Sequence, residues 1–104
     1  DLMRPSLYSA RHKIENLVES SEKKDLYSVV GPVCETADSF GSDFEVSANA
    51  GDYLVVYSAG AYGSSMGSNY NTRLKPAEIL VDQKSHKVIR KAETFDDLIK
   101  EEEL

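Results

Sequence analysis

The stretch that decides the fold class of this sequence is Tyr53-Leu54-Val55-Val56-Tyr57. Aromatic and β-branched residues dominate it, and such residues favour β-strands over helices. Residues 26–30, 77–82 and 87–90 show the same tendency, with turn-forming residues between the runs. Residues 83–86 lie between the last two runs, as the turn of a hairpin would. The pattern therefore predicts a mainly β fold whose short antiparallel strands form a sheet or a small β-barrel.

Short helices are expected at both ends of the chain, and the middle is less regular. Pro5 has the fixed φ that suits a first helical turn, so one or two turns are expected near the N-terminus. Thr94 and Asp97 form a variant of the capping box, which predicts a C-terminal helix. Residues 12–18 suit a strand or a continued helix. Residues 33–41 are rich in small and polar side chains and are expected to form a loop, and residues 41–52 are a second polar stretch.

The length and charge of the chain limit its function. A chain of 104 residues suits one modest domain, and we expect residues 1–104 to form it. A complete doubly wound nucleotide-binding sheet, or a barrel of eight βα units, would not fit in this length. The 12 Lys and Arg are interleaved with 18 Asp and Glu, for a formal net charge of −6. Nucleic acid is therefore not expected as a partner.

Cys34 is the single cysteine of the chain, so it cannot form an internal disulfide. It also lacks the Cys and His companions of a zinc site, so we expect no metal site and a reducing, cytoplasmic location. No apolar run approaches the roughly 20 residues of a membrane span, and no membrane partner is expected. The sequence begins at Asp1 rather than Met, which leads us to expect a segment of a longer chain.

The first candidate for chemistry is the pair Cys34 and Glu35. The pair follows Gly31-Pro32, which constrains the backbone, so a thiol there could face a cleft and exchange a proton. The alternative is that Cys34 is a small buried hydrophobic residue, and the residues alone leave both interpretations open. His12 and His86 have no partner at ligand or triad spacing, so we expect both to be structural or surface residues.

Arg4 and Tyr8 form the second candidate, because residues four apart on a helical turn project to one face. A guanidinium and a phenol there could together bind a carboxylate; a surface Arg beside a packed Tyr is the alternative. Tyr62 is the third candidate, because Gly60 and Gly63 let the backbone approach a ligand closely. Its phenol could donate to a phosphate or contact an amine, and its ring could pack on a flat cofactor. Ordinary turn chemistry would explain the same stretch equally well.

Three segments of the sequence resemble the C-terminal part of the diaminopimelate decarboxylases. They carry an Arg-Pro-x-x-Tyr motif, a Cys-Glu pair and a Gly-Ala-Tyr-Gly motif, and residues 76–81 and 88–98 agree as well. Order and spacing match along nearly the whole chain. The three segments are Leu2-Met3-Arg4-Pro5-Ser6-Leu7-Tyr8, Val30-Gly31-Pro32-Val33-Cys34-Glu35-Thr36-Ala37-Asp38 and Ala59-Gly60-Ala61-Tyr62-Gly63-Ser64-Ser65-Met66-Gly67-Ser68-Asn69-Tyr70-Asn71-Thr72-Arg73.

The resemblance implies a pyridoxal 5'-phosphate enzyme of the alanine racemase and ornithine decarboxylase type. Such enzymes attach the cofactor to a lysine of an N-terminal βα-barrel, and a homodimer shares each active site between its subunits. Residues 1–104 would be the C-terminal β-barrel domain, which binds substrate and forms dimer contacts. None of the eight lysines here lies in the cofactor-lysine motif, so that lysine is expected outside this segment. The full-length enzyme would convert meso-2,6-diaminopimelate to L-lysine and carbon dioxide, and the segment alone is expected to be inactive.

The resemblance also implies a role for each candidate residue. Cys34 matches the proton donor to the decarboxylated carbon, and Glu35 matches the acidic contact to the distal amino group of the substrate. Arg4 and Tyr8 match substrate contacts. Tyr62 matches a residue that touches both substrate and cofactor. The cofactor holds the electrons left by decarboxylation, so the protein has to supply recognition and one proton donor.

The sequence departs from the resembled pattern in two places. Arg73-Leu74-Lys75-Pro76 stands where Arg-Pro-Arg-Pro is usual, and residues 42–50 are less basic than is common. Two other functions stay open. One is a dimerisation and specificity domain of another such decarboxylase, acting on ornithine, arginine or carboxynorspermidine; the other is a free-standing small β protein without catalysis. An Asp usually follows the cysteine in the ornithine branch, so Glu35 favours the diaminopimelate branch.

Overall fold

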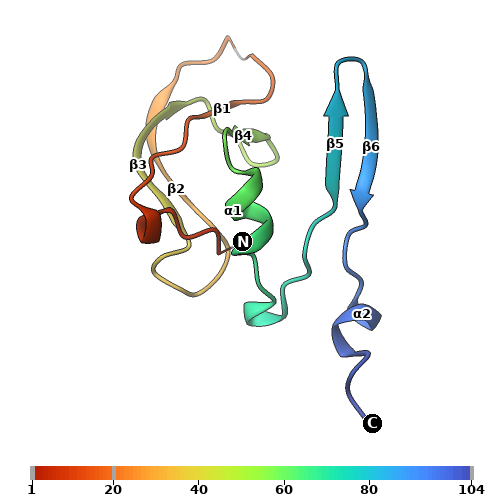
Figure 1. Cartoon of the computed structure of the whole chain (residues 1–104). Coiled ribbons are helices and arrows are strands. Elements are labelled where there is room, and N and C mark those ends of the chain that lie inside the picture. Colours follow the sequence, from red (N-terminus) through yellow and green to blue (C-terminus); the bar gives the residue numbers. More distant parts are fainter. Residues whose placement is uncertain (1, 20, 104) are drawn as a thin grey trace. The chain divides into compact units, whose positions relative to one another are not determined.

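The computed structural model describes residues 2–19 and 21–103. The chain forms two compact units, unit 1 (residues 1–67) and unit 2 (residues 68–104) (Figure 1). All strand pairs in both units are antiparallel. The mainly β fold class with short helices is therefore confirmed. The prediction that residues 1–104 form one substrate-binding and dimerisation domain stays a prediction.

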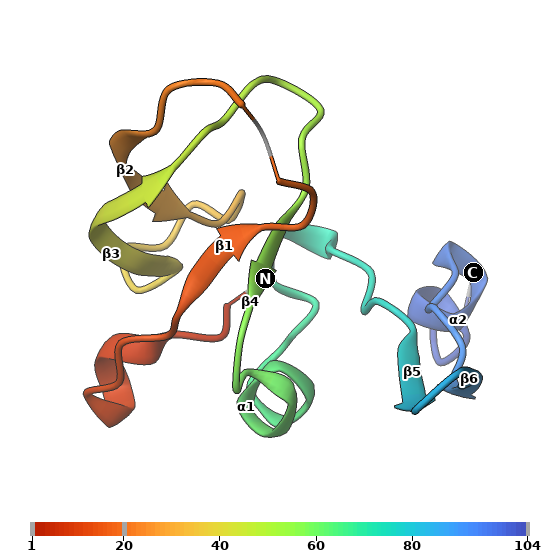
Figure 2. The ribbon, with the colours of Figure 1, turned by 90° about the horizontal axis from the view of Figure 1, so that it is seen from above.

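Unit 1 holds two pairs of strands and two short helical segments. These are η1 (Pro5–Tyr8, a 3₁₀ helix), β1 (Ile14–Asn16), β2 (Asp25–Val30), β3 (Ser39–Val46), β4 (Leu54–Val56) and α1 (Gly60–Ser65). β1 pairs with β4, β2 pairs with β3, and β1 also contacts β3. Figure 2 shows the two pairs side by side. The predicted strands at 26–30 and 53–57 are thus confirmed as β2 and β4, and the open choice for residues 12–18 is settled as strand β1.

Unit 2 holds a hairpin between two helical segments. These are η2 (Tyr70–Thr72), β5 (Glu78–Asp82), β6 (Ser85–Arg90) and α2 (Phe95–Ile99). The hairpin is confirmed, although its turn is shorter than expected, because Asp82 pairs with Ser85 and Gln83 takes a positive φ of 49°. The capping box is confirmed as well. The Asp97 amide donates to Thr94 Oγ1 at 3.2 Å, and the Thr94 amide donates to Asp97 Oδ2 at 2.9 Å.

The longest strand, β3, lies where a loop and a polar stretch were expected. Its sequence contains Gly41 and Asp43, residue types that are uncommon in strands, and both take a positive φ here, of 108° and 63°. Phe44 and Val46, two residues apart, are nonetheless buried at 5% and 1% exposure, while Glu45 between them is exposed. Pairing with β2 and burial of this alternating face outweigh the weak local preference for a strand.

The antiparallel strands do not close into the small β-barrel that was considered. Within the described residues they form three separate two-stranded sheets. β1 and β4 are only three residues long, and the β2–β3 register is irregular near Val29. Closure would need a continuous ladder between all neighbouring strands. A second difference is α1, a helix in the glycine-rich stretch for which turn chemistry was the alternative.

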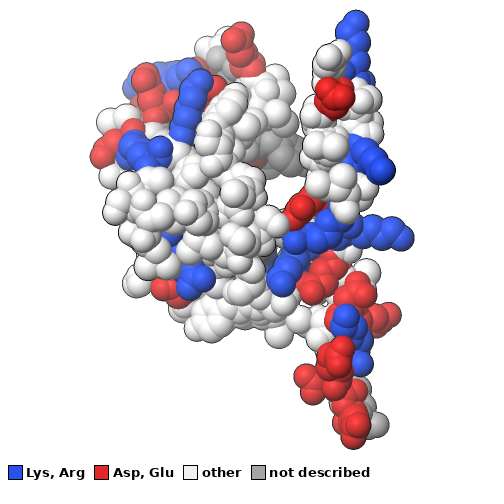
Figure 3. All heavy atoms as spheres, in the orientation of Figure 1, with Lys and Arg blue, Asp and Glu red and all other residues white. Residues whose placement is uncertain are grey.

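The hydrophobic core lies in unit 1 and is small. It consists of Leu2, Met3, Ile14, Val33, Phe44 and Val46. No described residue of unit 2 is buried, and the β5–β6 hairpin exposes apolar side chains such as Val81 at 69% and Ile89 at 56%. Figure 3 shows a largely uncharged centre on the visible face of unit 1 and carboxylates gathered toward the C-terminal end of unit 2.

The buried Asp38 carboxylate joins the N-terminal segment to the loop after β2. Its Oδ1 accepts from the Leu2 amide at 2.8 Å, and its Oδ2 accepts from the Val33 amide at 3.0 Å. The backbone of Asp38 also accepts from the Gly31 amide at 2.8 Å and donates to the Glu35 carbonyl at 3.0 Å. A Cβ at Gly31 would lie only 2.1–2.4 Å from the Asp38 carboxylate group. Glycine is therefore required at position 31 because the carboxylate occupies that space.

We predict that Gly31→Ala lowers the free energy of unfolding by about 1–3 kcal/mol, because the added methyl has to displace a buried, hydrogen-bonded carboxylate. Denaturant unfolding of the protein followed by circular dichroism measures the change.

The matched control is Gly60→Ala. A Cβ at Gly60 meets nothing within 4 Å, and the residue lies in α1. Alanine favours a helix, so this variant should change the free energy of unfolding by less than about 1 kcal/mol, and not downward. Equal destabilisation by the two substitutions would contradict the tight fit at Gly31.

Candidate functional site

A stacked pair of tyrosines, Tyr8 and Tyr62, forms the centre of the candidate site. Their ring centroids lie 4.1 Å apart with an interplanar angle of 13°. Tyr8 comes from the end of η1 and Tyr62 from α1, so the fold brings together two residues that the sequence singled out separately. Partial burial raises the pKa of Tyr8 above its usual value, and the neighbouring Tyr62 phenol raises it further. Tyr8 therefore keeps its proton at neutral pH.

His12 holds the hydroxyl of Tyr8. Its Nε2 lies 2.9 Å from Tyr8 Oη, and its Nδ1 lies 2.9 Å from the carbonyl oxygen of Tyr57. The imidazole is buried at 7% exposure, and its ring stands edge-on to that of Phe40 at 6.1 Å. A structural or surface role was expected for His12, and the residue is buried, but the contact with Tyr8 was not predicted. The signal that would have found it is the four-residue spacing between Tyr8 and His12.

Arg4 adopts an unusual backbone conformation. Its φ of 53° and ψ of 60° place it in the left-handed region, directly before Pro5. A non-glycine residue rarely adopts this conformation, and a following proline disfavours helical conformations further. Within the described residues, the Nε of Arg4 is buried and has no hydrogen-bond partner. A strained backbone that presents a buried, unsatisfied cationic donor is typical of a residue positioned for a ligand.

Cys34 and Glu35 lie on the loop between β2 and β3. Both are exposed, which excludes the alternative of a small buried core cysteine. The Glu35 amide donates to the Val33 carbonyl at 2.8 Å, and Asp38 closes the loop from its other side. The carboxylate of Asp38 also binds the Leu2 amide, two residues before Arg4. The loop and the arginine are therefore anchored to one buried group.

The predicted site residues thus form two groups on different elements. Arg4 and Tyr8 flank or end η1, and Met3 Sδ lies 3.9 Å from where a Cβ on Gly63 of α1 would be. Met3, which precedes η1, therefore lies close to the helix that carries Tyr62. Cys34 and Glu35 form the second group, on the loop held by Asp38.

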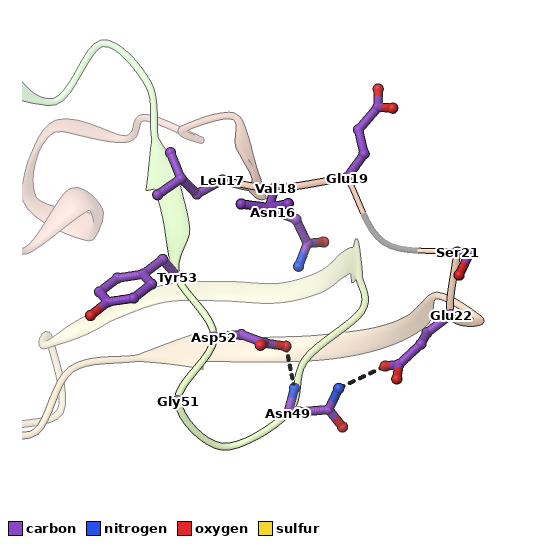
Figure 4. Close-up of a pocket in the computed structure, with 10 residues that line it drawn as sticks. All are labelled: Asn16, Leu17, Val18, Glu19, Ser21, Glu22, Asn49, Gly51, Asp52 and Tyr53. Atoms are coloured by element: carbon purple, nitrogen blue, oxygen red, sulfur yellow. Dashed lines mark hydrogen bonds between the residues drawn. The ribbon is translucent and has the colours of Figure 1, made fainter.

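A separate cavity of about 450 Å³ lies in another part of unit 1 (Figure 4). None of the predicted site residues lines it. Asn49 in this lining already donates two hydrogen bonds within the protein. Its backbone amide donates to Asp52 Oδ2 at 2.8 Å, and its Nδ2 donates to Glu22 Oε2 at 2.6 Å. Among the described residues of the lining there is no Lys or Arg that would attract a carboxylate. We therefore place the candidate site at the tyrosine pair and not here.

Within residues 2–19 and 21–103, no three His, Cys, Asp or Glu residues gather as metal ligands would. The helices in this part of the chain are too short and too polar to cross a membrane.

Comparison with known proteins places the chain in a family. The sequence model described as "Pyridoxal-dependent decarboxylase, C-terminal sheet domain" matches residues 1–60. The chain is 50% identical over 97 residues to a diaminopimelate decarboxylase of Neisseria meningitidis serogroup B, covering 92% of this chain and 23% of that protein. It is 48% identical over 99 residues to that of Haemophilus influenzae, covering 94% of this chain and 24% of the relative.

Solved structures agree with the sequence comparison. The chain superimposes with a TM-score of 0.88 and 40% identity on the diaminopimelate decarboxylase from M. jannaschii in complex with L-lysine, covering 100% of this chain and 24% of that one. The Helicobacter pylori enzyme, also complexed with L-lysine, gives a TM-score of 0.83 and 42% identity, covering 98% and 25%. The chain spans about a quarter of the length of these relatives. By sequence and by fold, the chain belongs to the pyridoxal-dependent decarboxylase family, as its C-terminal sheet domain.

Proposed function

We propose that this chain is the C-terminal part of a diaminopimelate decarboxylase, which converts meso-2,6-diaminopimelate to L-lysine and carbon dioxide. The single observation that carries the proposal is the buried, unsatisfied Nε of Arg4, in a strained backbone directly before the helical segment that ends at Tyr8. A buried guanidinium N–H without a partner favours binding of a carboxylate. The similarity to diaminopimelate decarboxylases along 92–100% of the chain supports the same substrate class.

Pyridoxal 5'-phosphate is the cofactor that we propose for the full-length enzyme, attached to a lysine outside this segment. When bound, it withdraws the electron pair that decarboxylation leaves on the substrate carbon. Tyr62 is the residue of this chain that would contact it. The fit is supported by the exposure of Tyr62, at 46%. Tyr8 is stacked on one face of its ring, so a flat ligand ring would approach the part of Tyr62 that Tyr8 leaves open.

Arg4 and Glu35 are proposed to recognise the distal end of the substrate, which carries a carboxylate and an ammonium group. The guanidinium of Arg4 would bind the carboxylate, and the carboxylate of Glu35 would bind the ammonium group. Tyr8 lies at the opposite end of η1 from Arg4 and is proposed as a further substrate contact. Together the charges select a substrate whose distal end is itself an amino acid.

Cys34 is proposed as the proton donor. After the bond to the carboxyl group breaks and carbon dioxide leaves, the thiol gives its proton to that carbon, and solvent then returns a proton to the sulfur. The exposure of Cys34 on an anchored loop supports this role, because the thiol has to reach a substrate held by other elements.

We further propose that the active site is shared in a homodimer and completed by an N-terminal βα-barrel. The exposed apolar side chains of the β5–β6 hairpin, with Val81 at 69%, support packing against another part of the assembly. The single cysteine suits a reducing compartment, and we propose a cytoplasmic location.

The role of Arg4 is tested in the full-length enzyme with Arg4→Gln and Arg4→Lys. Both variants should raise KM by about tenfold or more, because each loses the planar fork that binds a carboxylate in two places. Steady-state kinetics with diaminopimelate measures the effect. Lys84→Gln, which removes one positive charge from the exposed hairpin turn, serves as the matched control and should leave KM unchanged. A normal KM in Arg4→Gln would contradict the carboxylate contact.

Complementation tests the role of Cys34 and the shared site together. A full-length variant without the cofactor lysine and a full-length Cys34→Ala variant should each be inactive, the latter with normal cofactor absorbance. Mixed in equal amounts, they should recover about a quarter of the wild-type activity, because half of the dimers are mixed and each of these has one intact site.

The outcomes separate the competing functions. Full activity of Cys34→Ala would rule out the proton donor. Loss of activity without recovery in the mixture would favour a site contained in one subunit. Turnover of ornithine, arginine or carboxynorspermidine in preference to diaminopimelate would assign the chain to another branch of the family.

A further inference from the structure

His12 is a buried imidazole that the proposed reaction does not use. It touches three side chains or backbone groups of unit 1: the Tyr8 hydroxyl, the Tyr57 carbonyl and the Phe40 ring. Tyr57 directly follows β4 and Phe40 lies in β3, so the imidazole is held by the two strand pairs. These contacts hold His12 in a fixed position next to the hydroxyl of Tyr8.

The contacts of His12 determine which of its nitrogens carries the proton. A carbonyl oxygen can only accept, so the 2.9 Å contact between Nδ1 and Tyr57 requires the proton on Nδ1. In the neutral imidazole the other nitrogen, Nε2, is then an acceptor. The 2.9 Å contact to Tyr8 is consequently a bond in which the phenol donates to Nε2.

This direction of donation limits what Tyr8 can offer to a ligand. A phenol has one proton, and here it is directed at His12, while lone pairs of its oxygen stay available. The ring cannot turn away easily, because Tyr62 is stacked on its face at 4.1 Å and His12 stands edge-on at 5.9 Å with an angle of 83°. Tyr8 is thus fixed as a hydrogen-bond acceptor.

We propose that His12 is a positioning residue that fixes Tyr8 as an acceptor, so that Tyr8 recognises the distal ammonium group of the substrate and not a carboxylate. The inference rests on the proposed function, since it takes Tyr8 as a substrate contact. It divides the recognition of the substrate between Arg4, which binds the carboxylate, and Tyr8, which joins Glu35 in binding the ammonium group.

The test uses two variants of the full-length enzyme that alter one contact each. His12→Asn keeps an amide N–H near the position of Nδ1, and so keeps the bond to Tyr57, but removes the acceptor for Tyr8. His12→Gln carries its amide oxygen out to the position of Nε2 and can accept from Tyr8. The pair therefore separates the link to Tyr8 from the structural link to Tyr57.

Binding of L-lysine and 6-aminohexanoate, which differ only by the α-ammonium group, is measured by calorimetry. Decarboxylation leaves the other amine of diaminopimelate at the ε position, so the α-ammonium and the carboxylate of L-lysine are the distal groups of the substrate. The dissociation constant of 6-aminohexanoate divided by that of L-lysine should fall by about tenfold in His12→Asn and in Tyr8→Phe. It should stay near the wild-type value in His12→Gln. The double variant Tyr8→Phe with His12→Asn should be no worse than Tyr8→Phe alone, because His12 acts through Tyr8. Equal weakening of both ligands would overturn the inference, since it would place Tyr8 on a group that they share.

A ¹⁵N spectrum of the histidine side chains supplies a readout independent of turnover. His12, assigned by its absence in His12→Asn, should show a protonated Nδ1 and an unprotonated Nε2, with and without L-lysine. Two protonated nitrogens in the lysine complex would overturn the inference. A Tyr8→Phe enzyme with unchanged lysine binding would refute the substrate contact of the proposed function itself; changed binding in Tyr8→Phe but not in His12→Asn would refute the inference alone.

Discussion

The carboxylate of Asp38 is the group on which the arrangement of the candidate site depends. It is 6% exposed and accepts hydrogen bonds from Leu2 and Val33, which are 31 positions apart in the chain. Burial of a carboxylate is unfavourable unless hydrogen bonds compensate for the lost water, and here two backbone amides do so. Gly31 leaves the space that this carboxylate occupies, and the two hydrogen bonds join the N-terminal segment to the loop after β2.

The hydrogen bonds of Asp38 help to hold the N-terminal segment that carries Arg4 and Tyr8. The N-terminal segment contains positive φ angles at Leu2, Arg4 and Ser9, a strain that tertiary contacts have to offset. The buried amide of Leu2 is one such contact, and the stack of Tyr8 on Tyr62 is another. The chain spans about a quarter of the length of its relatives and leaves much apolar surface exposed.

The sequence predicted the parts of the fold that depend on local chemistry. The Thr94 capping box, the hairpin and the strand at 53–57 follow from neighbouring residues, and the structure contains them. β3 could not be predicted, because its stability comes from β2, a partner distant in sequence. The same holds for the site. The sequence singled out Tyr8 and Tyr62 separately, but only the fold stacks them. Likewise, nothing local marks Asp38 as the acceptor for the Leu2 amide.

The measurement that tests this account most directly is amide hydrogen exchange in the protein and in its Asp38→Asn variant. An amide side chain keeps the size of the carboxylate but offers one acceptor oxygen in place of two. The account predicts that Leu2 or Val33 loses protection by about tenfold or more, while the paired β2 and β3 strands keep theirs. Unchanged protection at both amides would show that the carboxylate does not anchor the two segments, and would contradict the account.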